Sequence, residues 1–134
     1  MATSIPVLEL SLKSSGSMSS YQYRAVLAST ANADNGATVV ASRGGKWTGV
    51  WQGNSTETTF DRVQVLGVAK VCAGDSSSTD TAITQGSMVV CSSVGQAVPS
   101  TAAGLFYLGI ALGSLSTGST GIIPVLLTPG AIST

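Results

Sequence analysis

Two cysteines and six acidic residues are the side chains of this sequence best suited to chemistry, because the chain contains no histidine. Without histidine it lacks the commonest general base and the commonest zinc ligand. Cys72 and Cys91 each end a valine-rich segment, where cysteine behaves as a small hydrophobic residue unless a nearby base activates it. The sequence therefore predicts no catalytic residues, and we expect the protein not to be an enzyme.

Metal and phosphate sites are also not expected. Asp75 and Asp80 could supply oxygen ligands to Ca²⁺, but the serine-rich run between them lacks the alternating acids of a calcium loop. Gly44-Gly45-Lys46 has neither the glycine four residues earlier nor the following helix of a phosphate-binding loop. The sequence predicts no metal ligands and no cofactor.

Two tryptophans leave two readings open. Trp47 and Trp51 flank Gly49, so on a strand all three residues would share one face. The indoles could then form a flat platform for a sugar or for a neighbouring protein. Alternatively, they are a core pair that covers the gap left by the glycine, since large aromatic side chains dominate protein cores.

Composition excludes several classes of partner. Six basic and six acidic residues cancel, and charged residues make up 9% of the chain, so the clustered basic charge of a nucleic-acid-binding protein is missing. The longest apolar run, residues 102–113, is shorter than the about 20 residues of a membrane-spanning helix. The N-terminal residues lack the pattern of a secretory signal. We therefore expect synthesis in the cytoplasm, with both cysteines reduced.

The N-terminal segment is predicted to be an extended arm. Residues 6–13 alternate with period two, which indicates a strand, and residues 14–20 are serine-rich without periodicity. We divide the chain into an arm and linker, residues 1–20, and a body, residues 21–134, and expect residues 1–13 to pair with a neighbouring chain. The candidate protein–protein interface residues of the arm and the body are Val7, Leu8, Leu10, Leu12, Trp47 and Trp51.

The body is predicted to be all-β. Strand patterns cover residues 21–27, the Val-Val segment between the turns at Asn35-Gly36 and Gly44-Gly45, and residues 47–52, 62–72, 88–91, 106–112 and 122–127. Turns rich in glycine and serine separate them, and no long window has a helical pattern. Short strands joined by such turns are typical of a small β-barrel or sandwich in one domain. The phrase GATVVASRGG at residues 36–45 returns as GSMVVCSSVG at residues 86–95. This similarity predicts that residues 36–66 and 86–126 are two related units.

The order of these segments resembles the capsid decoration, or cement, proteins of tailed bacteriophages. The resemblance runs from Tyr21 to Leu127, and its most specific parts are LGVAKV at residues 66–71, GSMVV at residues 86–90 and LGIAL at residues 108–112. In this family an acid usually follows the glycine of the second unit, where this chain has Ser87. The serine-rich front segment is also longer.

The resemblance implies a structural virion protein. It would dock as a homotrimer on the exterior of an assembled phage head, bind the major capsid protein and cement neighbouring capsid subunits, with no nucleic acid, membrane or cofactor involved. The alternative function is a carbohydrate- or receptor-binding β module that uses Trp47 and Trp51.

Overall fold

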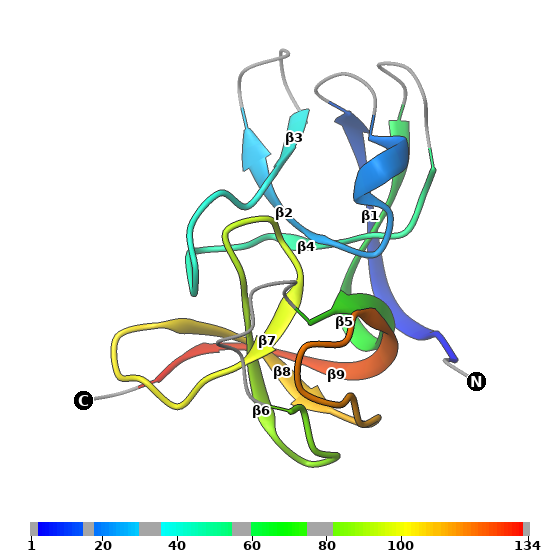
Figure 1. Cartoon of the computed structure of the whole chain (residues 1–134). Coiled ribbons are helices and arrows are strands. Elements are labelled where there is room, and N and C mark those ends of the chain that lie inside the picture. The colour runs from blue at the N-terminus through cyan, green and yellow to red at the C-terminus, as the bar shows by residue number, and fades with distance from the viewer. Residues whose placement is uncertain (1–2, 15–17, 30–35, 55–59, 75–81, 133–134) are drawn as a thin grey trace.

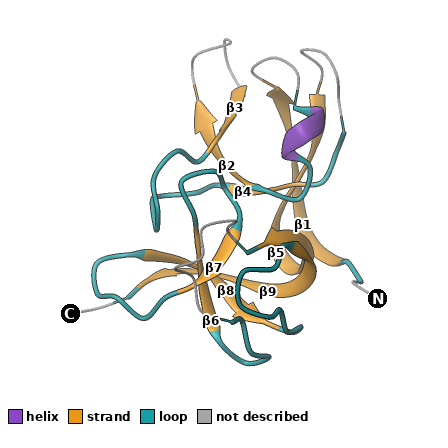
Figure 2. Ribbon diagram, in the orientation of Figure 1, coloured by secondary structure: helices purple, strands orange, loops and turns teal. Residues whose placement is uncertain are grey.

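The computed structural model describes residues 3–14, 18–29, 36–54, 60–74 and 82–132 of the chain (Figure 1). In these residues the regular structure is almost entirely β, with one short 3-10 helix, η1 (Ser19–Tyr21) (Figure 2). The all-β prediction is confirmed. The strands are β1 (Ile5–Ser14), β2 (Ala25–Ser29), β3 (Gly36–Val39), β4 (Gly49–Trp51), β5 (Phe60–Ala73), β6 (Met88–Cys91), β7 (Ala97–Pro99), β8 (Phe106–Ala111) and β9 (Gly121–Ala131).

The nine strands form one hydrogen-bonded sheet that closes on itself twice. Its order is β1-β3-β2-β4-β5-β7-β6-β8-β9, with two further pairings, β1–β5 and β5–β9. The first of these closes β1 to β5 into a ring, and the second closes β5 to β9 into another ring. The described chain therefore consists of two small barrels that share strand β5, and closure leaves few free strand edges.

Strand β5 serves both barrels because it is long and bends at Gly67. Its first part pairs with β1 and β4, and its second part pairs with β9. Gly67 is opposite Pro6 of β1 and Leu127 of β9, and its φ angle of +99° lies in a region that favours glycine. A glycine at this point lets the strand turn from one barrel wall into the other.

Each barrel has its own buried cluster. The N-terminal barrel is filled by Trp51, Val63, Val26, Leu12, Met18 and Ala37. The C-terminal barrel is filled by a larger aliphatic cluster from β5, β6, β8 and β9, to which β2 and β4 add Ala25 and Val50 at the junction. The alternation of buried and exposed residues in β5 and β9 thus places one side of each strand in a core and the other side at the surface.

Strand β1 is part of the chain's own sheet, so the prediction that residues 1–13 pair with a neighbouring chain is wrong. The strand pairs antiparallel with β5 along nearly its whole length. Leu12 and Met18 are buried in the N-terminal core, and Ser14 is fully buried. The lack of periodicity in the serine-rich stretch predicts a tether, but Ser14 and Met18 within it are packed. Residues 15–17 lie outside the described residues.

The predicted strand at residues 21–27 begins later than its alternation suggests. Tyr21 ends the 3-10 turn, and Tyr23 has a φ angle of +63°, so the strand starts only at Ala25. Local contacts favour this turn: the Tyr21 N–H donates to the Met18 carbonyl, and the Arg24 guanidinium lies 5.5 Å from the centre of the Tyr21 ring. These contacts outweigh the period-two pattern.

The two barrels are related units, because they repeat one strand order: β1-β3-β2-β4-β5 corresponds to β5-β7-β6-β8-β9, with the parallel pairs β1–β3 and β5–β7 at matching places. The bounds predicted from the repeated phrase are out of step with this repeat, since residues 36–45 contain β3, whose counterpart in the second barrel is β7, whereas residues 86–95 contain β6, the counterpart of β2. Both predicted units end in an antiparallel pair, β4–β5 and β8–β9. The register of these pairs differs, since Val50 lies opposite Gln64 but Ile110 lies opposite Leu126.

Candidate interaction surfaces

A row of aliphatic side chains crosses the outer side of the C-terminal barrel. Residues directly opposite each other in paired antiparallel strands project to the same side of the sheet. The intervening residues Ala69, Val125 and Val89 are buried, so this row faces outward. From β1 through β5, β9 and β8 to β6 the register partners are Ile5, Val68, Leu126, Ile110 and Met88.

Two further aliphatic side chains extend this row. Ile122 lies opposite Cys72, and the Leu112 N–H donates to the carbonyl of Pro124, which lies opposite Lys70. Ile122 is 49% exposed and Leu126 38% exposed, although both are large apolar residues. We call this surface the aliphatic face, and it comprises Ile5, Val68, Met88, Ile110, Leu112, Ile122 and Leu126.

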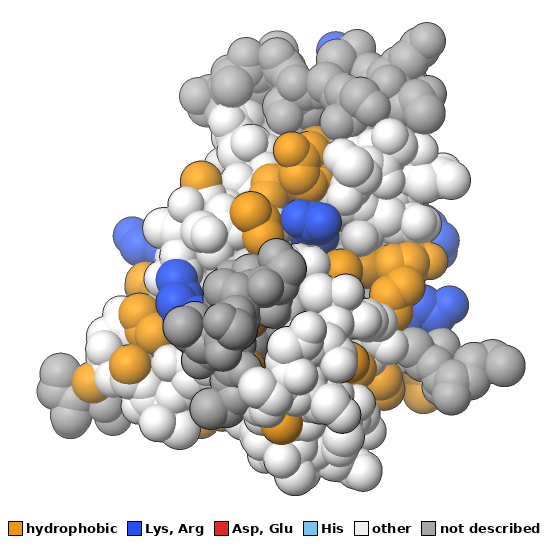
Figure 3. Space-filling model, viewed as in Figure 1, with side chains coloured by type: hydrophobic (Ala, Val, Ile, Leu, Met, Phe, Trp, Pro, Cys, Tyr) orange, Lys and Arg blue, Asp and Glu red, His pale blue; other side chains and the backbone are white. Residues whose placement is uncertain are grey.

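The register places one charged side chain, Lys70, on this side of the sheet, because it lies opposite Pro124, between Ile122 and Leu126 on β9. In Figure 3 apolar side chains form several separate areas on the side of the molecule shown, and the Lys and Arg side chains lie apart from one another. A surface of this kind can bind another molecule by burying apolar area, and it offers little long-range electrostatic attraction.

Of the predicted interface residues in the arm, three are at the surface and one is not. Val7, Leu8 and Leu10 are exposed, and Leu8 lies opposite the exposed Leu66 of β5. Leu12 is only 7% exposed because it packs in the N-terminal core. The prediction that Leu12 contacts a partner is therefore wrong for this fold.

The two tryptophans do not form a common platform. Trp51 is 0% exposed in the N-terminal core, whereas Trp47 is half-buried against the C-terminal core. The prediction assumed one strand from residue 47 to residue 52, but β4 begins at Gly49, so period-two alternation does not extend to Trp47. Trp51 therefore cannot bind a sugar or another protein.

Trp47 lines a pocket that its own hydrogen bond helps to fix. Its indole N–H donates to the Tyr107 carbonyl at 3.0 Å, which joins the segment before β4 to β8. The pocket has a volume of about 340 Å³, and we call it the aromatic pocket. Among the residues that line it are Lys46, Trp47, Thr48, Val65, Phe106 and Pro129.

A second, smaller and more polar pocket lies where β1 crosses β5. Its volume is about 190 Å³, and Glu9, Tyr23, Gln52, Arg62 and Lys70 are among its lining residues. Arg62 approaches Glu9 at 3.8 Å in an exposed pair of the kind that contributes little to stability. The Lys70 ammonium lies 6.0 Å from the centre of the Tyr23 ring.

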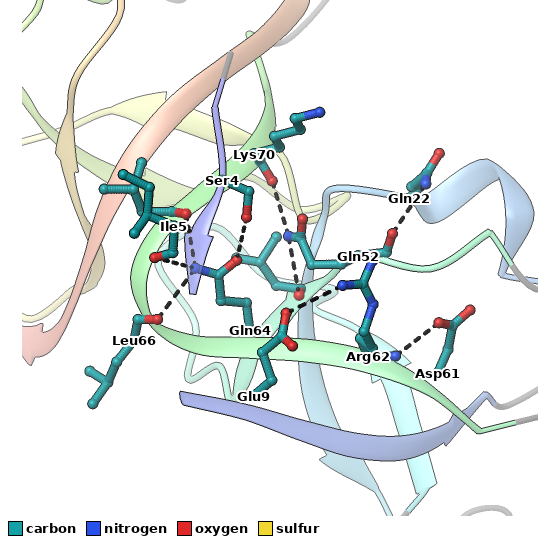
Figure 4. Close-up of polar contacts among 12 residues, drawn as sticks. Ser4, Ile5, Glu9, Gln22, Gln52, Asp61, Arg62, Gln64, Leu66 and Lys70 are labelled. Atoms are coloured by element: carbon teal, nitrogen blue, oxygen red, sulfur yellow. Dashed lines mark hydrogen bonds and ion pairs between the residues drawn. The ribbon is translucent and has the colours of Figure 1, made fainter. Parts of the chain in front are cut away.

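Two buried glutamines hold the backbone around this polar pocket (Figure 4). The Gln64 amide nitrogen donates to the carbonyls of Val68 at 2.9 Å and Leu66 at 3.3 Å, while Ser4 donates its hydroxyl to the Gln64 side-chain oxygen. Gln52 donates in the same way to the Lys70 carbonyl at 3.2 Å. These bonds satisfy backbone groups at the bend of β5, so the two glutamines support the pocket structurally.

The cysteines occupy different environments, and neither forms a disulfide. The Cys91 thiol is buried and points to the carbonyls of Ser42 and Gly45, each at 3.6 Å. Burial raises the pKa of the Cys91 thiol, and hydrogen bonds from the backbone offset part of this effect. Cys72 is half-buried and accepts a hydrogen bond from the Gln96 side chain at 3.4 Å. A raised pKa keeps the Cys91 sulfur protonated, which suits a structural role.

Within the described ranges, no three His, Cys, Asp or Glu side chains come together as metal ligands. Asp75 and Asp80, the residues considered for Ca²⁺, lie outside the described residues. No helix in the described part of the chain is long and apolar enough to span a membrane. No protein-family model, curated protein or solved structure matches this chain.

Sequence reasoning did not identify the aliphatic face or the aromatic pocket. A sequence signal for the aliphatic face is present in Ile122-Ile123-Pro124-Val125-Leu126, a strand that is apolar on both sides and so must expose apolar residues on one of them. The aromatic pocket brings together Trp47 and Phe106, which lie almost 60 positions apart, and no local sequence pattern links them.

Proposed function

We propose that this protein is a capsid decoration protein that docks on the exterior of an assembled phage head and cements neighbouring major capsid subunits. The observation that carries the proposal is the aliphatic face, a continuous apolar row across five strands of the barrel wall. The resemblance of LGVAKV, GSMVV and LGIAL to the decoration proteins supports it, because these segments contribute Val68, Met88 and Ile110 to that face, from β5, β6 and β8.

The size and chemistry of the face suit docking. Four of its seven residues, Ile5, Leu112, Ile122 and Leu126, are exposed large apolar side chains, and such residues gathered on one side of a small monomer often mark an interaction site. Burying one half-exposed leucine or isoleucine against a partner contributes on the order of 1 kcal/mol. A neutral chain also adds little electrostatic repulsion when many copies bind side by side on one shell.

The cementing mechanism requires no bond to be made or broken. A protein that binds only the assembled lattice stabilises that lattice by mass action, and contacts to two capsid subunits at once strengthen the effect. We further propose that the protein acts as a homotrimer on the capsid. Three copies of the aliphatic face would then engage the lattice simultaneously.

The test is co-sedimentation of the purified protein with heads of the encoding phage that lack it. Leu126→Lys and Ile122→Lys place a charge in the middle of the aliphatic face, and we expect each to weaken head binding at least tenfold. Val94→Lys is the matched control, because Val94 is similarly exposed but lies in the loop between β6 and β7.

All three variants should give the circular dichroism spectrum of the parent protein, since each residue is already at the surface. Two results would contradict the proposal: no binding of the parent protein to heads, or equal binding by the parent protein and the Leu126→Lys variant.

A further inference from the structure

The residues that line the aromatic pocket have no role in the proposed docking function. Flat apolar surfaces from Trp47, Phe106 and Pro129 surround it, and the exposed Lys46 lies at its rim. The pocket is built from the segment before β4, the start of β8 and the end of β9. Leu126 and Ile122 lie elsewhere along β9, so ligand binding here is separable from docking through the aliphatic face.

The hydrogen bond of Trp47 restricts what the pocket can recognise. The indole N–H is already donated to the Tyr107 carbonyl, so it cannot donate to a ligand. An extended proline-rich peptide presents backbone carbonyls that need such donors. A sugar ring differs because the C–H groups on one of its faces can pack on the face of an aromatic ring. Since the hydrogen bond fixes the indole before binding, little ordering cost remains.

The charge at the rim selects the kind of sugar. The Lys46 ammonium lies 6.0 Å from the centre of the Phe106 ring, and none of the described residues that line the pocket is acidic. A carboxylate on the ligand would therefore meet a cation without a competing anion nearby. The Thr48 hydroxyl accepts a hydrogen bond from the Ala28 N–H at 2.8 Å, which leaves its own hydrogen available to a sugar hydroxyl.

We propose that the aromatic pocket binds an acidic pyranose, such as a uronic acid residue of a polysaccharide. Trp47 packs against the apolar face of the ring, and Lys46 pairs with the carboxylate. If the protein coats a particle as proposed above, many copies can bind one polysaccharide chain at once, so weak binding at each site adds up to a high overall affinity.

The experiment titrates the full-length protein with trigalacturonate and, separately, with its fully methyl-esterified form, which has the same rings without the charge. Isothermal titration calorimetry gives the affinity, and tryptophan fluorescence reports the site because Trp51 is buried away from the pocket. We expect saturable binding of the acid with a change in fluorescence, and binding at least tenfold weaker for the ester.

Variants assign the binding to this pocket. Lys46→Gln and Trp47→Leu should each weaken trigalacturonate binding at least tenfold, whereas Lys70→Gln removes the same charge outside the aromatic pocket and should leave the affinity unchanged. Lys46 is exposed, so its substitution tests the proposal even if Trp47→Leu does not fold. Absence of saturable trigalacturonate binding up to roughly 10 mM, or equal affinity for the acid and its methyl ester, would overturn the proposal. So would an unchanged affinity of the Lys46→Gln variant for trigalacturonate, or a proline-rich peptide that binds at Trp47.

Discussion

The side-chain amide of Gln64 donates a hydrogen bond to the carbonyl oxygen of Val68, four residues further along the same strand, at 2.9 Å. A regular strand cannot make this contact, because its residues move apart by about 3.3 Å each. The bond therefore depends on the bend of β5 at Gly67. It also satisfies backbone at the point where the strand passes from one barrel to the other.

Replacing this amide should destabilise the protein. Gln64→Ala leaves the carbonyls of Leu66 and Val68 without their buried donor, and we expect the free energy of unfolding to fall by about 1–3 kcal/mol. Urea denaturation followed by circular dichroism measures the change. Gln85→Ala, at an exposed glutamine, is the control and should change stability by less than about 0.5 kcal/mol. Equal effects of the two substitutions would show that the Gln64 bonds do not stabilise the bend.

The bend itself should require glycine. A Cβ atom at Gly67 would collide with the Ile5 carbonyl and the Val7 amide of β1, whereas a Cβ at Gly86 would meet no atom within 4 Å. Both glycines have φ angles near +90°, so Gly86→Ala measures the conformational cost alone. We expect about 1–2 kcal/mol for Gly86→Ala and a clearly larger loss for Gly67→Ala. Thermal denaturation compares them, and similar melting temperatures would contradict the collision.

Strand β1 supplies a third matched pair. Leu12 is 7% exposed and Leu10 40% exposed on the same strand. Leu12→Ala should cost about 2–5 kcal/mol because it leaves a cavity in the N-terminal core, while Leu10→Ala should cost much less. Chemical denaturation gives both values. If Leu12→Ala were as stable as Leu10→Ala, β1 would not be packed in its own barrel.

The Cys91 thiol should make stability sensitive to alkaline pH. Burial raises its folded-state pKa above the ordinary value of 9.0, so the folded protein favours the neutral thiol. This contribution is fully present below about pH 9 and is lost as the pH rises through the folded-state pKa. Between about pH 9 and 10.5, Cys91→Ala should lose less stability than the parent protein. Identical pH profiles for the parent protein and Cys91→Ala would refute the prediction.

Much of the fold could be predicted because the strands carry clear local patterns. Period-two alternation located β1, and valine-rich runs located β5 and β6, since each places alternate or successive residues in a core. The start of β2 was missed because the turn at Tyr21 depends on the packing of Met18 and Arg24. A sequence pattern does not report such contacts.

Partner strands were harder to predict than the strands themselves. Leu8, Leu10 and Leu12 indicated an apolar strand, but the same alternation suits pairing with β5 or with another chain. Only the closing of the N-terminal barrel distinguishes the two. The burial of Trp51 is not predictable for the same reason: which face of the three-residue strand β4 points into the core depends on the strands that pair with it.

The sharing of β5 also constrains the order of folding. Neither barrel can close without this strand, and the C-terminal barrel also needs β9, which follows β5 by almost 50 residues. A nascent chain can therefore complete the C-terminal barrel only after β9 has left the ribosome. Pairings this distant in sequence form slowly, and the outer strand β9 must find β5 before the aliphatic face exists as a surface. Under the proposed docking function, a molecule whose C-terminal barrel is still open would lack the surface that binds the shell.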